Sequence, residues 1–251
     1  MRILDSHVHL KHGDAARTEY SAETIVRTLD AAGIAKAVVF AMSTTTAESI
    51  RMAEAAAARF PDRLIPYVYA LPSYEQGVLD LIEEAVIRRG FRGIKIHEGE
   101  CRLTEYLIDP VIALAGDLGV PCLIDFIGDL DTARRLLETF PGTTIIIAHF
   151  GRYLCTDPAL LRRAVSLAET HPNAVLDASG VVCLWAIEEA VRRIGSKRIL
   201  FGTDGPHPLP DLASMARREI RKIQSLEISE AAKADILGAN LARLLGEADV
   251  E

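Results

Sequence analysis

The sequence has few of the features that build disulfide frameworks or membrane spans. Cysteine is scarce in its 251 residues, and no CxxC pair occurs among Cys101, Cys122, Cys155 and Cys183. Isolated cysteines without such a pair are typical of a reducing compartment. No apolar run reaches the ~20 residues that a membrane span needs. We therefore expect a cytoplasmic protein with no membrane partner.

Excess positive charge is also missing. The chain has 28 Lys and Arg against 35 Asp and Glu, a net charge of -7, and no run of basic residues is longer than two. Binding to nucleic acid or to an anionic membrane usually needs a basic patch. The composition therefore predicts neither partner. A homo-oligomeric state stays open.

Hydrophobic residues, at 49%, suffice for a continuous core. Apolar, β-branched segments alternate with amphipathic helical patterns along the whole chain. The strands predicted from this alternation are 2–9, 37–42, 64–70, 93–97, 121–126, 144–149, 174–179 and 199–203. Two Asp-Pro pairs, Asp109-Pro110 and Asp157-Pro158, each predict a helix start, with the proline in the first helical position.

Eight strand-helix units of about 31 residues each match the usual size of a (β/α)8 TIM barrel. Strands that are apolar throughout, such as 37–40, suggest burial on both faces of a parallel sheet. An open doubly wound sheet is the alternative, but no GxGxxG follows the first strand. The sequence therefore predicts one domain over residues 1–251, an α/β barrel.

Polar residues end most of the predicted strands. His7 and His9, in Asp5-Ser6-His7-Val8-His9, face the same side because side chains alternate along a strand. Two such imidazoles form half of a site for a transition metal, although two ligands alone do not complete one. In a barrel the active site lies at the carboxyl ends of the strands. Other strand-end residues there are Lys95, His97, Asp125, His149, Asp177, Ser179 and Asp204.

These residues resemble the amidohydrolase superfamily of metal-dependent hydrolases, in the amidohydrolase-related branch that includes aminocarboxymuconate semialdehyde decarboxylase. The resemblance covers nearly the whole chain in order. It rests on 5–9 (DSHVH), 90–97 (GFRGIKIH), 146–151 (IIAHFG), 201–206 (FGTDGP) and 236–245 (ILGANLARLL).

The resemblance implies a divalent metal held by His7, His9 and Asp204, with Asp204 also accepting a proton from metal-bound water. It implies that His149 binds a second metal or serves as acid, base or oxyanion partner. Zinc is the first choice of metal, and manganese and iron are alternatives. A divalent ion lowers the pKa of bound water toward ~7, which supplies hydroxide near neutral pH.

One position departs from the family pattern. The family usually ends strand five with a ligating histidine, where this chain has Asp125. We expect Asp125 to stay close to the metal, and His97 from strand four is a further candidate ligand. Lys95 has two open interpretations: a bridge between metals, or a buried ion pair with Asp5 or Asp125.

The predicted function is hydrolysis of an amide, lactone or ester bond of a small-molecule substrate by metal-activated water. Arg152 and His207 follow strand-end residues and are candidates for substrate binding, whereas His12 is predicted to lie at the surface. A decarboxylase using the same rim is one alternative. A barrel that has lost its catalytic metal is another.

Overall fold

The computed structural model describes residues 2–208 and 211–247, in which nine strand segments alternate with helices. The strands are β1 (Leu4–Lys11), β2 (Lys36–Ala41), β3 (Leu64–Pro66), β4 (Val68–Tyr69), β5 (Ile94–His97), β6 (Cys122–Asp125), β7 (Ile145–Ile147), β8 (Ala174–Asp177) and β9 (Ile199–Leu200).

All strand pairs are parallel, and they form the sheets β1-β2-β3 and β4-β5-β6-β7-β8-β9. The segments β3 and β4 are parts of one strand, separated only by Tyr67. The Tyr67 amide donates to the Val39 carbonyl at 3.0 Å, so pairing with β2 continues across the interruption. On the other side, the Ser6 amide donates to the Phe201 carbonyl at 3.0 Å, which joins β1 to the end of β9. These contacts link the two sheets into the predicted eight-stranded barrel.

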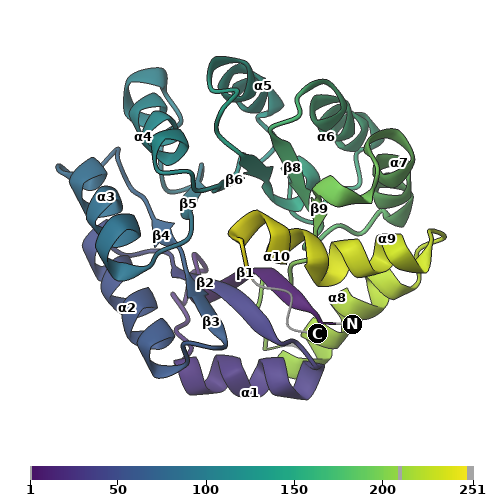
Figure 1. Ribbon diagram of the computed structural model, residues 1–251, viewed down its shortest axis with the longest axis horizontal. Coiled ribbons are helices and arrows are strands. Elements are labelled where there is room, and N and C mark those ends of the chain that lie inside the picture. The colour runs from purple at the N-terminus through teal and green to yellow at the C-terminus, as the bar shows by residue number, and fades with distance from the viewer. Residues whose placement is uncertain (1, 209–210, 248–251) are drawn as a thin grey trace.

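Helices surround this barrel, and Figure 1 shows α1 to α8 around the outside of the strands. The helices are α1 (Ala22–Ala32), α2 (Thr46–Arg59), α3 (Val78–Arg89), α4 (Glu105–Asp117), α5 (Leu130–Thr139), α6 (Pro158–Thr170), α7 (Leu184–Ile194), α8 (Leu212–Gln224), α9 (Glu230–Ala234) and α10 (Asn240–Leu245). Within the described ranges, no helix has the length and apolar character needed to cross a membrane.

One of the two predicted helix starts is confirmed. Asp157 caps α6 by accepting a hydrogen bond from the Ala159 amide, and Pro158 begins the helix. The start predicted at Asp109-Pro110 is wrong, because α4 begins at Glu105 and contains Pro110. Asp109 lies inside the helix and pairs with Arg135 of α5 at 2.9 Å.

Several strands are shorter than predicted, and at β7 and β9 this changes how the functional residues are presented. β7 ends at Ile147 and β9 at Leu200, so both His149 and Asp204 lie beyond a strand end. Their backbones are left-handed, with φ of 56° and 55°. Left-handed backbone is uncommon for residues with a side chain and often occurs at functional sites. These turns place His149 and Asp204 at the rim of the barrel.

The C-terminal segment packs tightly against the beginning of the chain. Gly238 lies in a π-helical turn, 235–239, that contacts β1 and β9. A Cβ atom added to Gly238 would be 2.2 Å from the carbonyl oxygen of Arg2. The buried amide of Asn240 donates to the carbonyls of Ser196 and Ile199 at 2.8 and 2.7 Å. These contacts fix the C-terminal segment beside β1 and β9.

Candidate metal centre

β1 presents two buried imidazoles to the inside of the barrel. The ring centroids of His7 and His9 are 5.2 Å apart, and Phe40 of β2 packs beside both rings. Burial, with a further effect from the positive charge of Lys95, lowers the pKa of His7. Burial also holds the pKa of His9 well below its usual value. Both histidines are therefore neutral near pH 7, the form that binds a metal.

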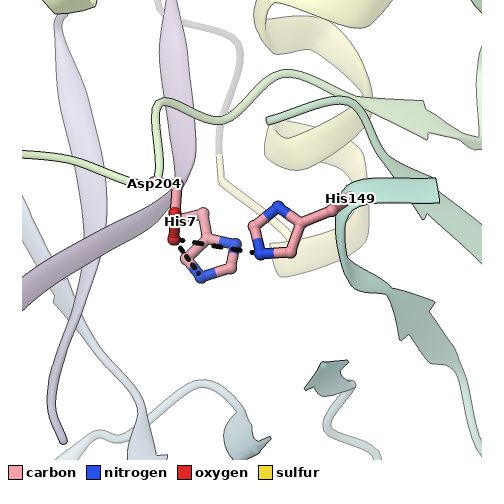
Figure 2. A group of neighbouring side chains, drawn as sticks. All are labelled: His7, His149 and Asp204. Carbon is pink, nitrogen blue, oxygen red and sulfur yellow. Dashed lines mark ion pairs between the residues drawn. The ribbon is translucent and has the colours of Figure 1, made fainter. Parts of the chain in front are cut away.

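The carboxylate of Asp204 lies among three imidazole nitrogens. Its Oδ1 atom is 2.9 Å from Nε2 of His9, 3.1 Å from Nε2 of His7 and 4.0 Å from Nε2 of His149. Burial opposes ionisation of Asp204, but these histidines together hold its pKa well below the usual range. Figure 2 shows His7, His149 and Asp204, three of the four side chains of this cluster, converging on one point. The ligand atoms of these three residues lie within 4.8 Å of one another.

Residues of β8 and the turn after it orient two of these imidazoles. Nδ1 of His7 is 2.9 Å from Oδ2 of Asp177, and Nδ1 of His149 is 3.0 Å from the carbonyl oxygen of Ser179. Both partners are acceptors, so they favour the tautomer with hydrogen on Nδ1. For His7, whose Nε2 is 3.1 Å from Oδ1 of Asp204, this tautomer turns the lone pair of Nε2 toward Asp204. His149 carries hydrogen on Nδ1 in its neutral and in its charged form. Carboxylates and carbonyls that contact metal-binding histidines in this way increase their affinity for the ion.

The donor set fits a divalent ion. Nε2 of His7 is fully buried and makes no hydrogen bond within the described chain, although Oδ1 of Asp204 lies 3.1 Å away. Two imidazole nitrogens and one carboxylate oxygen, open toward a cavity, match the three-ligand pattern of catalytic zinc sites. The ligand atoms of His7, His149 and Asp204 lie within 4.8 Å of one another, and Nε2 of His9 contacts the same oxygen of Asp204 at 2.9 Å, so these four side chains are the ones that would hold the ion.

Asp125 contacts one of these histidines, His149, and also His97 of β5. Its Oδ2 atom is 3.3 Å from Nε2 of His97 and 3.4 Å from Nε2 of His149. Burial alone would raise the pKa of Asp125, but hydrogen bonds from His149 and His97 outweigh burial and lower it. His149 is thus held between Asp125 and Asp204. Burial disfavours its charged form, yet Asp204, Asp125 and Asp177 together raise the pKa of His149 to about 9.

The sequence left open an ion pair of Lys95 with Asp5 or Asp125, and the described residues contain none within 4.0 Å. Asp5 accepts instead from the amides of His7 and Thr203 and from the Thr203 hydroxyl. Nζ of Lys95 is fully buried, has no hydrogen-bond partner among residues 2–208 and 211–247, and lies 5.5 Å from the ring centroid of Phe40.

One cavity of about 380 Å³ collects the predicted rim residues. It is lined by His7, His9, His97, Asp125, His149 and Asp204, together with Lys95. It also includes residues that the sequence did not assign to the site: His12, Asp14, Met42, Glu100 and Tyr153.

The prediction of a surface position for His12 is wrong, because its ring stacks on His9 at 4.5 Å and its Nε2 lies 2.7 Å from the Pro206 carbonyl oxygen. No periodic pattern marks a loop residue of this kind.

Of the two predicted substrate-binding residues, Arg152 lies outside the cavity and His207 lies at the edge of the site. Arg152 is exposed and is not among the residues that line the cavity. The next residue, Tyr153, lines it instead, with its ring centroid 5.1 Å from that of His149. The Tyr153 ring packs on Gly180, where an added Cβ would be 2.3 Å away. His207 lies at the edge of the site, its Nε2 3.8 Å from Oδ2 of Asp204.

Comparison with protein families gives a match that covers most of the chain. The family model for amidohydrolases matches residues 5–246. This chain belongs to the amidohydrolase family. A search of curated protein sequences found no match.

Several solved structures share the fold of this chain. An uncharacterized TIM-barrel protein from Bordetella bronchiseptica is 18% identical, with a TM-score of 0.78 over 98% of this chain and 99% of its own. A 5-carboxyvanillate decarboxylase from Sphingomonas paucimobilis has a TM-score of 0.75 at 15% identity, over 98% and 99% of the two chains. An amidohydrolase from Burkholderia multivorans with bound zinc has a TM-score of 0.74 at 15% identity and the same coverage. At these identities the likeness shows the fold.

Proposed function

We propose that the chain is a metal-dependent hydrolase that uses metal-activated water to cleave an amide, lactone or ester bond of a small molecule. One observation carries this proposal: Oδ1 of Asp204 lies within 3.1 Å of Nε2 of both His7 and His9, beside an open cavity. Membership of the amidohydrolase family and the bound zinc of the Burkholderia multivorans structure support it.

The metal in this proposal is zinc, held by His7, His9 and Asp204, because two imidazoles and one carboxylate suit zinc well. A bound divalent ion would lower the pKa of a water molecule toward ~7 and polarise the substrate carbonyl. The contact of Asp177 with His7 keeps the ligating nitrogen of His7 free of hydrogen. Asp125 and His97 complete the wall of the site on the side of β5 and β6.

Two residues of the chain handle protons in this proposal. Asp204 would accept the proton of the attacking water, since its carboxylate is ionised and lies beside Nε2 of both His7 and His9 at the cavity. His149 faces the cavity with Nε2, between Asp125 and Asp204, and donates a hydrogen bond to the oxygen that gains charge during attack. Tyr153 and His207 border the space left for the rest of the substrate.

Decarboxylation is the second candidate, favoured by the shared barrel of 5-carboxyvanillate decarboxylase. The same cluster of His7, His9, Asp204 and His149 would then bind an acid and protonate the carbon that loses carbon dioxide. No residue of the site discriminates between the two reactions. Analysis of the reaction products distinguishes hydrolysis from decarboxylation.

The test begins with elemental analysis of the purified protein. Activity is then measured with lactones, esters, amides and aromatic acids, before and after chelation and after return of zinc. The proposal predicts hydrolysis that disappears on chelation and returns with zinc, with no carbon dioxide released. Asp204→Asn should abolish turnover, whereas Arg88→Gln, an exposed change on α3, should not alter it. Turnover that persists in fully chelated protein would contradict a metal-dependent reaction of either kind.

We also place the protein in the cytoplasm. Cys101, Cys122, Cys155 and Cys183 are all free thiols, three of them buried. Free thiols are typical of a reducing compartment. Localisation of a tagged chain by cell fractionation tests this part of the proposal.

A further inference from the structure

Lys95 is a buried cation that the proposed reaction does not use. Its side chain is fully buried and lines the metal-site cavity, and Nζ has no hydrogen-bond partner within the described chain. An unpaired ammonium in the interior costs several kcal/mol of desolvation. A lysine with no structural partner is therefore costly to stability unless it serves another purpose.

The carboxylates nearest to Lys95 are already engaged by other donors. Asp125 contacts His97 and His149, and it accepts from the Ile127 amide at 2.9 Å. Asp204 contacts His7 and His9, and Asp177 contacts His7 and accepts from Ser179.

Glu100, the fourth carboxylate whose charge acts on Lys95, is engaged as well. It accepts from the Ser43 amide at 3.0 Å and from the Tyr69 hydroxyl at 2.5 Å. All four carboxylates therefore have contacts of their own with groups other than Lys95. The three donor hydrogens of Lys95 stay free for an acceptor that enters from the cavity.

The aromatic ring of Phe40 limits where this ammonium can move. Nζ lies 5.5 Å from the ring centroid, within the range of a cation-π contact. Backbone pairing of Lys95 with Tyr69 and Leu123 in the neighbouring strands fixes the start of the side chain. The charge is thus held at the floor of the cavity, beside the histidines of β1.

We propose that Lys95 is the anion-binding residue of this cavity, and that the substrate carries a carboxylate whose oxygen accepts a hydrogen bond from its ammonium. This inference rests on the proposed function, since it takes the cavity as the place where substrate binds. An ionised acceptor suits a buried ammonium best, because charge-assisted hydrogen bonds offset the desolvation of both groups. A cavity of about 380 Å³ accommodates a small organic acid.

The test uses two matched pairs of probes, benzoate with benzamide and phenylacetate with phenylacetamide. Calorimetric titration measures their affinity for the wild type, Lys95→Met, Lys95→Gln and Arg88→Gln, each before and after chelation. Titration of the chelated protein removes direct binding of a carboxylate to the metal. Arg88→Gln is the matched control, because it removes one positive charge from an exposed position outside the cavity.

The wild type and Arg88→Gln should bind each carboxylate more tightly than its amide. Lys95→Met and Lys95→Gln should weaken carboxylate binding by about tenfold or more and leave amide binding unchanged. Lys95→Met should also keep or raise the melting temperature, since it removes an unpaired buried charge. A structural role for Lys95 would instead lower the melting temperature.

Two results would overturn the inference: equal carboxylate affinity in the wild type and Lys95→Gln, or no preference of the wild type for a carboxylate over its amide. Both are binding measurements and need no turnover. Activity that survives chelation would refute the proposed reaction and leave these affinities unaffected. The two failures are therefore distinguishable.

Discussion

Replacing Asp177 by asparagine should weaken metal binding although Asp177 is not a proposed ligand. Its Oδ2 atom lies 2.9 Å from Nδ1 of His7, and its Oδ1 atom accepts from the Ser179 amide at 3.0 Å. Asparagine keeps the shape but can turn an NH₂ group toward His7. Such a donor favours hydrogen on Nε2, the nitrogen proposed to bind the ion.

Loss of a contact of this kind typically reduces metal affinity by about 10- to 100-fold, which corresponds to roughly 1.4–2.7 kcal/mol. The complete burial of Asp177 and His7 favours the upper part of that range, because no water can replace the lost acceptor. The assay is a competition titration with a chromophoric chelator, in which zinc partitions between the chelator and the protein.

Asp211→Asn is the matched control. Asp211 caps α8 at an exposed position, and asparagine is an equally good capping residue. Its zinc affinity should equal that of the wild type. An Asp177→Asn protein that is fully folded by circular dichroism and retains wild-type zinc affinity would refute the reasoning.

Three further predictions follow from other contacts. Asp125→Asn should weaken zinc binding or turnover. Asp125→His, which restores the ligand that the family usually has, should retain or tighten zinc binding. If Asp125→Asn leaves zinc affinity, turnover and melting temperature unchanged, Asp125 has no role in the site. The double variant His7→Ala, His9→Ala should purify without metal by elemental analysis, and undiminished metal would contradict the site. Gly238→Ala should cost about 1–3 kcal/mol in denaturant unfolding, because the added Cβ meets a backbone oxygen at 2.2 Å. The control Gly142→Ala, which meets nothing within 4 Å, should be near neutral.

The barrel could be predicted from the sequence because the strand and helix patterns that indicate it are local and repeat along the chain. Most strands are largely apolar and the segments that follow them have helical periodicity, so small errors in single elements do not change the architecture. The predicted helix start at Asp109-Pro110 shows such an error. An Asp-Pro pair fits a helix start, but here Asp109 pairs with Arg135 of the next helix, a tertiary contact that no local signal encodes.

The convergence of the rim residues could also be predicted, because parallel strands end at one edge. His7, His9, His97, Asp125, His149 and Asp204 line the same cavity. Their roles with a metal came from the resemblance and stay predictions.

The loop residues of the site could not be predicted. Tyr153 rather than Arg152 lines the cavity because its ring rests on Gly180, a glycine in a different loop. His12 enters the site because its side chain reaches the Pro206 carbonyl, 194 positions away in the sequence. Contacts between distant loops leave no periodic trace in either segment.

The hydrogen bonds that join β1 to the end of β9 have a consequence for how the enzyme is made. Asp204 follows His9 by 195 positions, so synthesis at ~5–20 residues per second separates them by roughly 10 to 40 s. The two histidines leave the ribosome without their carboxylate partner, and the complete donor set exists only after the last strand has joined the first. Binding of the proposed metal would then be a late event in the maturation of this protein. An ion bound there would hold the two ends of the barrel together against local opening.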